Sequence, residues 1–406
     1  MTTNQEITLP IQRRHVLLGR YLVGVVIIVL SLFYLGIPDY LFVVSYQVEW
    51  KFIYYILFIL ITPFLLLNPK SFARYLCSPF SLWALALLII SSVGMLGGPD
   101  IDKNVVSLVS TQNQYIILTI LFGFIFSITP TKHYERIIPI LAMIIPLLVI
   151  IDFIRPGILY PLGTIGTMPG RAGATFINPN KAGEAMLLTG LLAIPVMRPK
   201  YRICLILLTF LGIIMTFSRG AILVWTLFCF FLLKTRKIPL KGSILIIAAF
   251  IFMPTLLGCF KYYLEARQDL GSSLNDVITR LSFFQNPTTF TDASAQLRVT
   301  LLQEGWDLFL HNPILGAGTG ATTFWDLGSG THNEFLKLAA EHGIFGIALW
   351  VTLAVILWKG EYFEDRRFQF AAAGMFIFSS FFTHNMFDFP YWLFTFALIS
   401  GQRRFY

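Results

Sequence analysis

The 406-residue chain has few charged side chains, and this shortage excludes a water-soluble protein. Asp, Glu, Lys and Arg make up 13% of its residues and hydrophobic residues 56%, whereas soluble domains carry about 25% charged residues. The four cysteines include no CxxC pair, which excludes a disulfide scaffold and predicts core or lipid-facing thiols. The same composition excludes collagen-like repeats and low-complexity disorder. We therefore expect an all-α integral membrane protein with many spans.

Twelve apolar runs come close to the roughly 17–25 residues that a helix needs to cross a bilayer. The run after Arg13 and Arg14 has no clear small-residue cleavage site, so we interpret it as a retained first span and not as a signal peptide. The short aromatic segment 37–49 is expected at the membrane interface. The predicted spans are 16–36, 50–67, 79–98, 112–130, 136–154, 181–197, 201–217, 219–235, 242–260, 343–358, 368–384 and 388–402.

The long connection 261–342 divides the chain into three parts. Nine predicted spans precede it in 1–260, and three follow it in 343–406. Most of the 30 Lys and Arg residues fall in the connections on one side and in the two termini, which the positive-inside rule assigns to the cytoplasm. The connection 261–342 is then expected on the outer side. The net charge of +9 is a topology signal, and we expect no nucleic-acid partner.

Ionisable residues are almost missing from the middles of the predicted spans. Ion-coupled transporters place such groups near the bilayer midplane, and channels line a pore with them, so the pattern favours neither class. The exceptions lie near the outer ends of the spans: Asp152, Arg155, Lys181, Glu184, Arg219, His384 and Asp388. Because charges in a membrane are costly and usually functional, we expect chemistry at the outer surface, on a substrate with a lipid tail.

The connection 261–342 contains a predicted amphipathic helix and a glycine-rich stretch. Residues 294–311 place apolar side chains at helical spacing, with Arg298 near the start and Asn312-Pro313 at the end. This helix either lies on the membrane with Arg298 as an interfacial anchor or brings Arg298 to a site. The stretch 316–330 lacks the GK[ST] of a Walker A loop. By itself it predicts only flexibility or close backbone approach.

The sequence Thr331-His332-Asn333-Glu334 precedes an apolar run and has the pattern of a capping box. Thr331 is then expected as the N-cap of a helix and Glu334 as its third residue, with His332 in the first position. The positive end of a helix favours neutral imidazole and offers N–H groups to an anion. His332 is therefore either a general base for a hydroxyl nucleophile or a surface histidine at a helix start.

Arg219 is a second candidate, because it lies in the short connection between the spans 201–217 and 219–235. Its guanidinium is expected at the outer interface, where it either snorkels to water or serves as a fixed cation for a phosphate. The bidentate fork of arginine suits a phosphate oxyanion. Further polar residues on the same predicted side would add to such a pocket: Arg155, Arg171, Asn180 and Lys181.

These residues carry a resemblance to the O-antigen ligase/Wzy-C superfamily. His332-Asn333, nine further residues and Gly343-Ile344-Phe345-Gly346 match its pattern H[NSQ]x9GxxG. The pair His311-Asn312 does not match it, because Thr322 and Trp325 stand at the glycine positions.

Two further elements resemble the same superfamily. Thr216-Phe217-Ser218-Arg219 is similar to its short turn with an essential arginine, and Leu297-Arg298 is similar to the arginine that opens the helix of its long periplasmic loop. The superfamily contains lipopolysaccharide O-antigen ligases (WaaL), many O-antigen polymerases and bacterial protein O-oligosaccharyltransferases. Three similar elements in the same order identify the superfamily more firmly than the activity within it.

The resemblance implies a GT-C-like fold in the bacterial inner membrane, with a helix-containing periplasmic loop and cytoplasmic termini. It implies inverting, metal-independent glycosyl transfer without a cofactor, from undecaprenyl pyrophosphate to a sugar hydroxyl of the lipid A-core. His332 would deprotonate or orient the acceptor, while Arg219 and Arg298 would bind the pyrophosphate. Substrate binding would extend to Arg155, Arg171, Asn180, Lys181 and Asn333.

The acceptor is not determined by these residues. An O-antigen ligase is the first hypothesis, and a Wzy-type polymerase, which extends another undecaprenyl-linked repeat, would use the same donor chemistry. Protein O-oligosaccharyltransferases often carry a soluble C-terminal domain, for which the sequence has no candidate. A lipid-linked sugar transporter is a third hypothesis, although it would be expected to have a polar central cavity.

Overall fold

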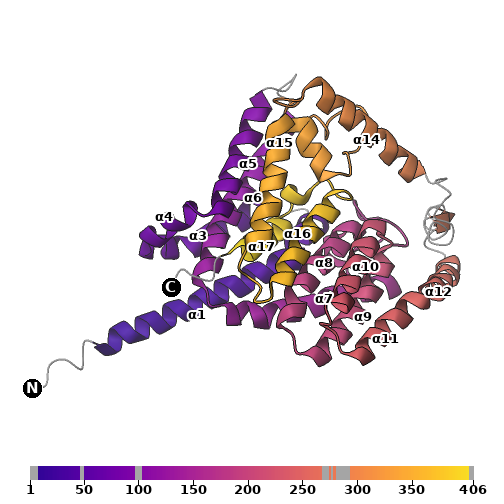
Figure 1. Cartoon of the computed structure of the whole chain (residues 1–406), viewed down its shortest axis with the longest axis horizontal. Helices are drawn as coiled ribbons and strands as arrows, with labels where there is room; N and C mark the ends of the chain where they lie inside the picture. The colour runs from indigo at the N-terminus through magenta and orange to yellow at the C-terminus, as the bar shows by residue number, and fades with distance from the viewer. Residues whose placement is uncertain are drawn as a thin grey trace, which may run out of the picture.

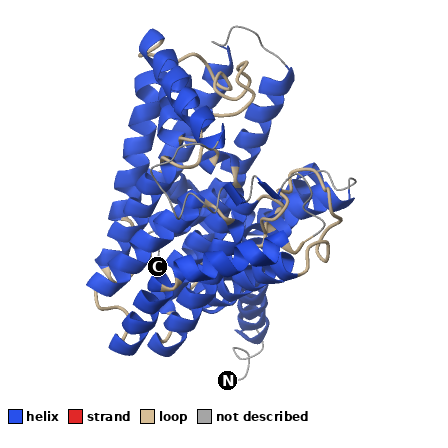
Figure 2. Cartoon of the chain, turned by 90° about the vertical axis from the view of Figure 1, so that its right-hand side faces the viewer, coloured by secondary structure: helices blue, strands red, loops and turns tan. Residues whose placement is uncertain are grey.

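The structure, a computed structural model, describes residues 8–45, 50–96, 103–267, 274–275, 278–279 and 293–401. Every regular element in these ranges is a helix (Figure 2), so the all-α prediction is confirmed for them. The stretches 268–273, 276–277 and 280–292 of the predicted outer connection lie outside the described residues. The four cysteines are free thiols, as their spacing predicted.

The helices follow the apolar runs of the sequence, and several begin with Pro. Up to residue 154 they are α1 (Thr8–Tyr34), α2 (Ile37–Ser45), α3 (Trp50–Leu67), α4 (Pro69–Leu76), α5 (Pro79–Leu96), α6 (Lys103–Ile128), η1 (Thr131–His133) and α7 (Tyr134–Ile154). Then come η2 (Ala174–Phe176), α8 (Pro179–Val196), α9 (Pro199–Thr216), α10 (Arg219–Lys234), α11 (Leu240–Ile251) and α12 (Met253–Glu265). The last group is α14 (Ala293–His311), α15 (Glu334–Lys359), α16 (Arg366–Ser380), η4 (Met386–Asp388) and α17 (Pro390–Ser400).

The helix α17 lies in the interior of the molecule (Figure 1). Its residues from Pro390 to Ile399 are all buried, and it packs against α1, α6, α8 and α15. A helix that is hydrophobic on every side is expected to be enclosed in this way. Large aromatic side chains such as Trp392, Phe394 and Phe396 fill the space between these helices.

Small residues bring α10 close to α8. A Cβ atom added at Gly183 would lie 2.8 Å from the Cβ of Ala221, and one added at Gly190 would lie 3.1 Å from the ring of Trp225. Since glycine has no side chain, the two helices approach closely there. This packing sets the position of the N-terminal end of α10, where Arg219 lies.

Five to eight stretches of the described chain are long and apolar enough to cross a membrane. Five are single helices, and three are pairs of helices bent at a short break, such as the pair around Asn68 with a bend of 106°. The predicted spans coincide in position with helices, but α10, α16 and α17 are short and α8 begins with polar residues. The count of twelve spans and the GT-C-like arrangement therefore stay predictions. A multi-pass membrane protein agrees with these helices.

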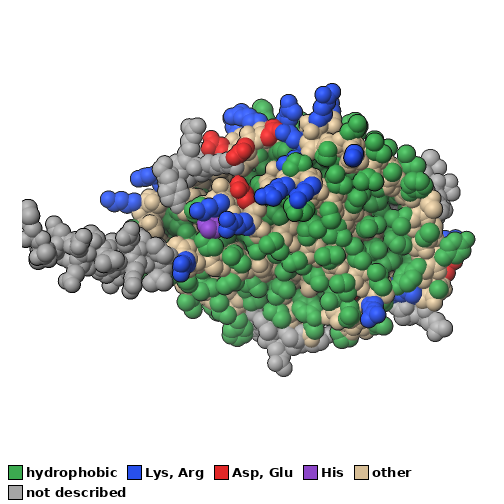
Figure 3. Space-filling model, turned by 90° about the horizontal axis from the view of Figure 1, so that it is seen from below, with side chains coloured by type: hydrophobic (Ala, Val, Ile, Leu, Met, Phe, Trp, Pro, Cys, Tyr) green, Lys and Arg blue, Asp and Glu red, His purple; other side chains and the backbone are tan. Residues whose placement is uncertain are grey.

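The surface is suited to lipid. Figure 3 shows a face that is largely hydrophobic, with most of its Lys and Arg side chains in the upper half of the view. Large apolar side chains are exposed along α3 and α11, among them Ile59 (68%), Leu66 (74%) and Ile251 (68%). Apolar exposure on this scale is typical of a membrane-facing surface and not of a soluble protein.

Candidate active site: an arginine-lined pocket beside His332

Arg219 begins α10 directly after a tight turn. The helix α9 ends at Thr216 because Phe217 adopts a left-handed backbone conformation with φ of 46°. Ser218 is the N-cap of α10, and Arg219 is its first residue. This turn at the ends of two packed helices holds the backbone of Arg219, and the short connection that the sequence predicted is confirmed.

The loop between α7 and α8 adds a second arginine at this turn. The Nε of Arg171 donates a hydrogen bond to the carbonyl oxygen of Thr216 at 2.8 Å, and a terminal guanidinium nitrogen donates to Oδ1 of Asn180 at 2.8 Å. The carbonyls at the C-terminal end of α9 favour such a cation. Arg171 is therefore held beside the turn that carries Arg219.

Asp152 anchors the same loop to the protein. Its Oδ2 accepts hydrogen bonds from the hydroxyl of Tyr160 at 2.7 Å and from the backbone N–H groups of Gly173 at 3.0 Å and Ala174 at 2.9 Å. Three donors compensate for the burial of this carboxylate. Asp152 thus fixes the loop that presents Arg171.

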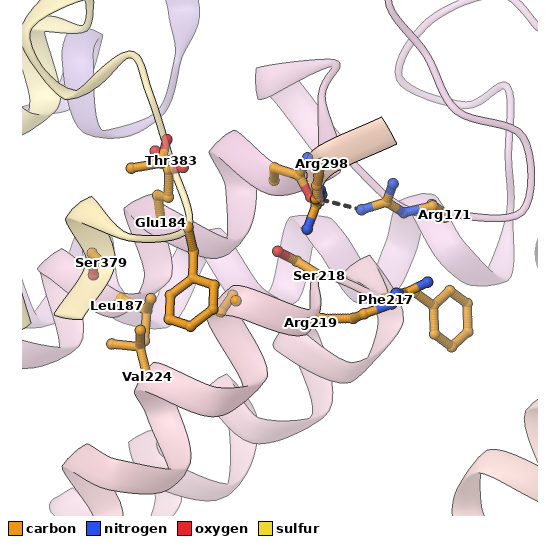
Figure 4. A pocket seen from close by; sticks show the side chains of 14 residues that line it. Arg171, Glu184, Leu187, Phe217, Ser218, Arg219, Val224, Arg298, Ser379 and Thr383 are labelled. Atoms are coloured by element: carbon orange, nitrogen blue, oxygen red, sulfur yellow. Dashed lines mark hydrogen bonds between the residues drawn. The ribbon is translucent and has the colours of Figure 1, made fainter. Parts of the chain in front are cut away.

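Three arginines line one pocket, with a volume of about 530 Å³. In the close-up of Figure 4, Arg171, Arg219 and Arg298 lie on one side of it, and Leu187 and Val224 lie on the other. Guanidinium groups that converge on one space suit a ligand with several phosphate oxygens. The apolar opposite wall suits a ligand that is also partly hydrocarbon.

Glu184 is an acidic residue in the wall of this pocket. Its Oε2 accepts hydrogen bonds from the hydroxyl of Tyr391 at 2.9 Å and from Nε1 of Trp392 at 2.8 Å. These two donors lie on α17 and attach the carboxylate to the core. Three arginines outnumber this one carboxylate, so the pocket keeps an excess of positive charge that favours an anion.

The helix α14 brings Arg298 to the pocket, and the helix predicted over 294–311 is confirmed. Leu301 is fully buried, and a Cβ atom added at Gly305 would lie 3.2 Å from the side chain of Thr331. On the other face Trp306 is 47% exposed. The helix α14 therefore joins the arginine pocket to the segment that carries His332, and its exposed apolar side chains suit a position at the membrane surface.

His332 lies immediately before α15 and not in its first turn. The N-cap is Asn333, whose Oδ1 accepts a hydrogen bond from the backbone N–H of Leu336 at 2.9 Å. The capping box was wrong: Thr331 Oγ1 donates to the carbonyl oxygen of Asn333 at 2.9 Å, and Glu334 is the first helical residue. His332 has a left-handed backbone with φ of 53°. Outside glycine this conformation costs about 1–2 kcal/mol and is concentrated at functional sites.

The imidazole of His332 is neutral at pH 7. Burial lowers its pKa to about 4, and the positive charge of Arg298 contributes in the same direction. The sequence predicted a neutral imidazole because of the helix dipole, but burial and a neighbouring guanidinium account for it here. The Nε2 of His332 lies 3.3 Å from Oγ of Ser329. An unprotonated imidazole has a free lone pair that can accept the proton of a hydroxyl group, as a general base must.

A second histidine contacts the first. The ring centroids of His332 and His384 are 4.5 Å apart, and their planes meet at 85°. A Cβ atom added at Gly330 would lie 2.5 Å from the ring of His384, so only glycine allows this contact. Thr383, the residue before His384, lines the arginine pocket. The connection between α16 and α17 therefore reaches both the pocket and His332.

A buried ion pair joins the first turn of α15 to η4. The Nζ of Lys337 is 2.7 Å from Oδ2 of Asp388, and the two side chains are 7% and 17% exposed. The Nε2 of Gln112 donates to Oδ1 of Asp388 at 3.2 Å, and Oε2 of Glu334 accepts a hydrogen bond from the N–H of Met386 at 2.7 Å. These contacts hold the start of α15 against α6 and η4. The sequence analysis did not pair Lys337 with another residue, although its spacing from Glu334 is typical of a shared helix face.

The two glycines of the H[NSQ]x9GxxG pattern allow α15 to break. Gly343 has φ of 59° and ψ of −140° inside the helix, and a Cβ atom there would lie 2.4 Å from the carbonyl oxygen of Ile314. A Cβ atom at Gly346 would lie 2.0 Å from the carbonyl oxygen of Leu338, since the two halves of the helix cross closely. Only glycine fits at either position.

The glycine-rich stretch caps this break. The N–H of Ala317 donates to the carbonyl oxygen of Ala340 at 2.8 Å, and the N–H of Gly318 donates to that of Glu341 at 3.1 Å. These carbonyls have no helical partner beyond the break, so the loop satisfies them. The close backbone approach predicted for 316–330 is confirmed at this place.

Three of the predicted binding residues do not line the pocket. Arg155 is exposed at the C-terminal end of α7. The Nζ of Lys181 is 3.1 Å from Oδ2 of Asp39 and 4.0 Å from the ring centroid of Phe389. Asn333 caps α15. Substrate contacts of these three residues stay predictions, whereas Arg171, Asn180, Arg219 and Arg298 share one pocket.

Among the residues that the structure describes, no group of three or more His, Cys, Asp or Glu side chains is placed to hold a metal ion. The cationic character of the pocket comes from arginines instead. Metal-independent chemistry stays a prediction.

The helices and this site define a multi-pass membrane protein with an arginine-lined pocket next to a neutral histidine. Residues 204–351 match the model of the family Wzy_C, described as O-Antigen ligase. The match confirms the resemblance to the O-antigen ligase/Wzy-C superfamily, and it covers Arg219, Arg298, His332 and both motif glycines. Neither a curated protein nor a solved structure matches the chain.

Proposed function

We propose that the chain is a membrane-embedded glycosyltransferase of the O-antigen ligase type. It would transfer a glycan from undecaprenyl pyrophosphate to a hydroxyl group of the lipid A-core, on the periplasmic side of the bacterial inner membrane. One observation carries the proposal: Arg298 lines a pocket together with Arg171 and Arg219, and its charge also lowers the pKa of His332. A phosphate site and a candidate base are thereby adjacent.

The reaction follows from these two neighbouring groups. The acceptor oxygen attacks the anomeric carbon, the bond from that carbon to the pyrophosphate oxygen breaks, and undecaprenyl pyrophosphate leaves. Neutral His332 accepts the proton of the hydroxyl group. The arginines stabilise the negative charge that develops on the leaving oxygen, which metal ions do in other enzymes. A single displacement of this kind inverts the anomeric carbon.

The direct test is transfer by the purified protein, supplied with undecaprenyl-pyrophosphate-linked glycan and lipid A-core. Glycan on the lipid A-core would support a ligase. Longer undecaprenyl-linked chains without a lipid A-core product would identify a Wzy-type polymerase and contradict the proposed acceptor. No transfer by a folded protein would contradict the enzyme and favour a transporter.

Replacing Arg219 by Lys should reduce transfer by about tenfold to a hundredfold, although the charge is kept. Lysine lacks the planar fork that donates two parallel hydrogen bonds to a phosphate, and one hydrogen bond to a charged group contributes about 1.5–3 kcal/mol. Initial rates at varied donor concentration measure the loss. The matched control is Arg136→Lys, since Arg136 is exposed in the first turn of α7 and outside the pocket. Equal rates for wild type and Arg219→Lys would exclude a phosphate clamp.

The value of kcat/KM should stay constant between about pH 5.5 and 8, where a free histidine with a pKa of about 6.5 would titrate. Because burial and Arg298 lower the pKa of His332 to about 4, the imidazole is a neutral base throughout this range and is protonated only below it. Arg298→Gln should move the acidic decline to higher pH, since it removes a neighbouring positive charge. A decline near pH 6.5 in the wild type would contradict a buried neutral base.

Transfer should continue in EDTA. The pyrophosphate is already a good leaving group, and three arginines around the pocket can neutralise its charge. The rate is compared before and after dialysis against the chelator. A loss that Mg²⁺ reverses would show that a metal ion takes part.

A further inference from the structure

An apolar groove with a volume of about 690 Å³ runs between α10 and α16. Its lining residues recur every three or four positions on each helix, so they form one face of each. On α10 they are Val224, Leu227, Phe228 and Phe231, and on α16 they are Phe370, Ala371, Gly374, Met375 and Phe378.

The groove has a buried floor and an exposed rim. Phe228 and Met375 are 4% and 5% exposed, whereas Leu227, Phe370 and Phe378 are 41%, 66% and 40% exposed. In a membrane the rim faces lipid, and a hydrocarbon chain can enter from the side. The small side chains on α16 leave room for such a chain between the two helices.

The groove lies next to the arginine pocket. Val224 lines both cavities, and Phe378 in the groove precedes Ser379 in the pocket. From Val224 to Phe231 the groove follows α10 for about 10 Å at 1.5 Å per residue. A molecule with an anionic head among the arginines can therefore extend a chain past Val224 toward the groove.

We propose that the groove binds the polyprenyl chain of the donor at the end nearest its pyrophosphate, an inference that rests on the proposed function. In the donor, the chain is bonded to the pyrophosphate itself, so it must leave the arginine pocket at a wall of that pocket. In a lipid A-core acceptor, sugars separate the acyl chains from the accepting hydroxyl group. The groove that opens beside Val224 thus fits the donor, and phenylalanine rings of its walls suit an unsaturated, branched chain.

Gly374 allows the groove to be filled without disturbing the protein. A Cβ atom at this position would meet no atom within 4 Å, and the residue is exposed. Glycine is also unfavourable inside a helix, so a larger residue does not weaken α16. Gly24 in α1 has equally open surroundings and provides the matched control.

The test compares binding of undecaprenyl pyrophosphate and of inorganic pyrophosphate to the full-length protein in detergent. Gly374→Trp should weaken binding of undecaprenyl pyrophosphate about tenfold, because the indole occupies the path of the chain. Inorganic pyrophosphate should bind wild type and variant equally, since the arginines are untouched. Gly374→Ala and Gly24→Trp should bind both ligands like the wild type. Leu227→Trp fills the same groove from α10 and should repeat the result of Gly374→Trp.

Equal affinity of the wild type, Gly374→Trp and Leu227→Trp for undecaprenyl pyrophosphate would overturn the proposal. So would a rise in the KM for lipid A-core with unchanged donor binding, which would assign the groove to an acyl chain of the acceptor. Binding is measured without turnover. If filling the groove weakens binding of undecaprenyl pyrophosphate but the wild type transfers no glycan, the proposed function is contradicted and the assignment of the groove is kept.

Discussion

Replacing His332 by Asn should reduce glycan transfer by about a hundredfold to ten-thousandfold, the usual contribution of a general base. Asn cannot accept the proton of the acceptor hydroxyl. It does tolerate the left-handed backbone that His332 adopts, with φ of 53°. Transfer rates at saturating donor and acceptor measure the loss, because the base acts in the transition state and not in substrate binding.

The matched control is His311→Asn. His311 precedes an asparagine as His332 does, but it is exposed at the end of α14, and its Nδ1 lies 2.7 Å from the carbonyl oxygen of Asp307. We expect this variant to keep the rate of the wild type. The base assignment would fail if His332→Asn kept wild-type activity, or if both variants lost activity equally. His332→Ala should also be inactive, and its additional backbone strain would lower its stability.

Replacing Lys337 by Met should destabilise the protein by about 3–5 kcal/mol, the usual loss when one partner of a buried ion pair is removed. The substitution keeps most of the length of the side chain but leaves Asp388 and the neighbouring Glu334 without their buried cation. Thermal unfolding in detergent measures the loss. Since proteins are stable by about 5–15 kcal/mol, this loss is a large part of the total, and the midpoint of thermal unfolding should fall clearly.

Lys237→Met is the control for this prediction. Lys237 is paired with Asp365, but the two side chains are 28% and 31% exposed, and surface pairs contribute about 0–1 kcal/mol. The double variant Lys337→Met with Asp388→Leu should recover part of the stability, since both charges are gone. Equal destabilisation by Lys337→Met and Lys237→Met would argue against a special role for the buried pair.

The bounds of the helix α14 could be predicted from the local sequence. Its apolar spacing and the following Asn312-Pro313 predicted 294–311, and the helix runs from Ala293 to His311. The short turn before Arg219 was equally predictable. Helical periodicity depends on neighbours within a few residues, so the sequence determines it almost completely.

The start of the helix α15 could not be predicted from the local sequence. Thr331 and Asn333 are both good N-caps, and the capping-box pattern favoured Thr331. The structure begins the helix at Asn333, with His332 in a left-handed conformation against His384 and Gly330. That choice depends on a ring that lies 52 residues further along the chain, and no local spacing encodes it.

By itself, the sequence determined the membrane class, the positions of the helices and the three sequence elements that contain Arg219, Arg298 and His332. These features arise from composition and short spacings. Only the tertiary structure decided that Arg171 shares the pocket while Arg155 and Lys181 do not, and that Lys337 pairs with Asp388. The same holds for the break at Gly343, which the loop around Ala317 caps. Such contacts join residues that are distant in the chain, and they depend on how whole helices pack and which buried groups must be neutralised.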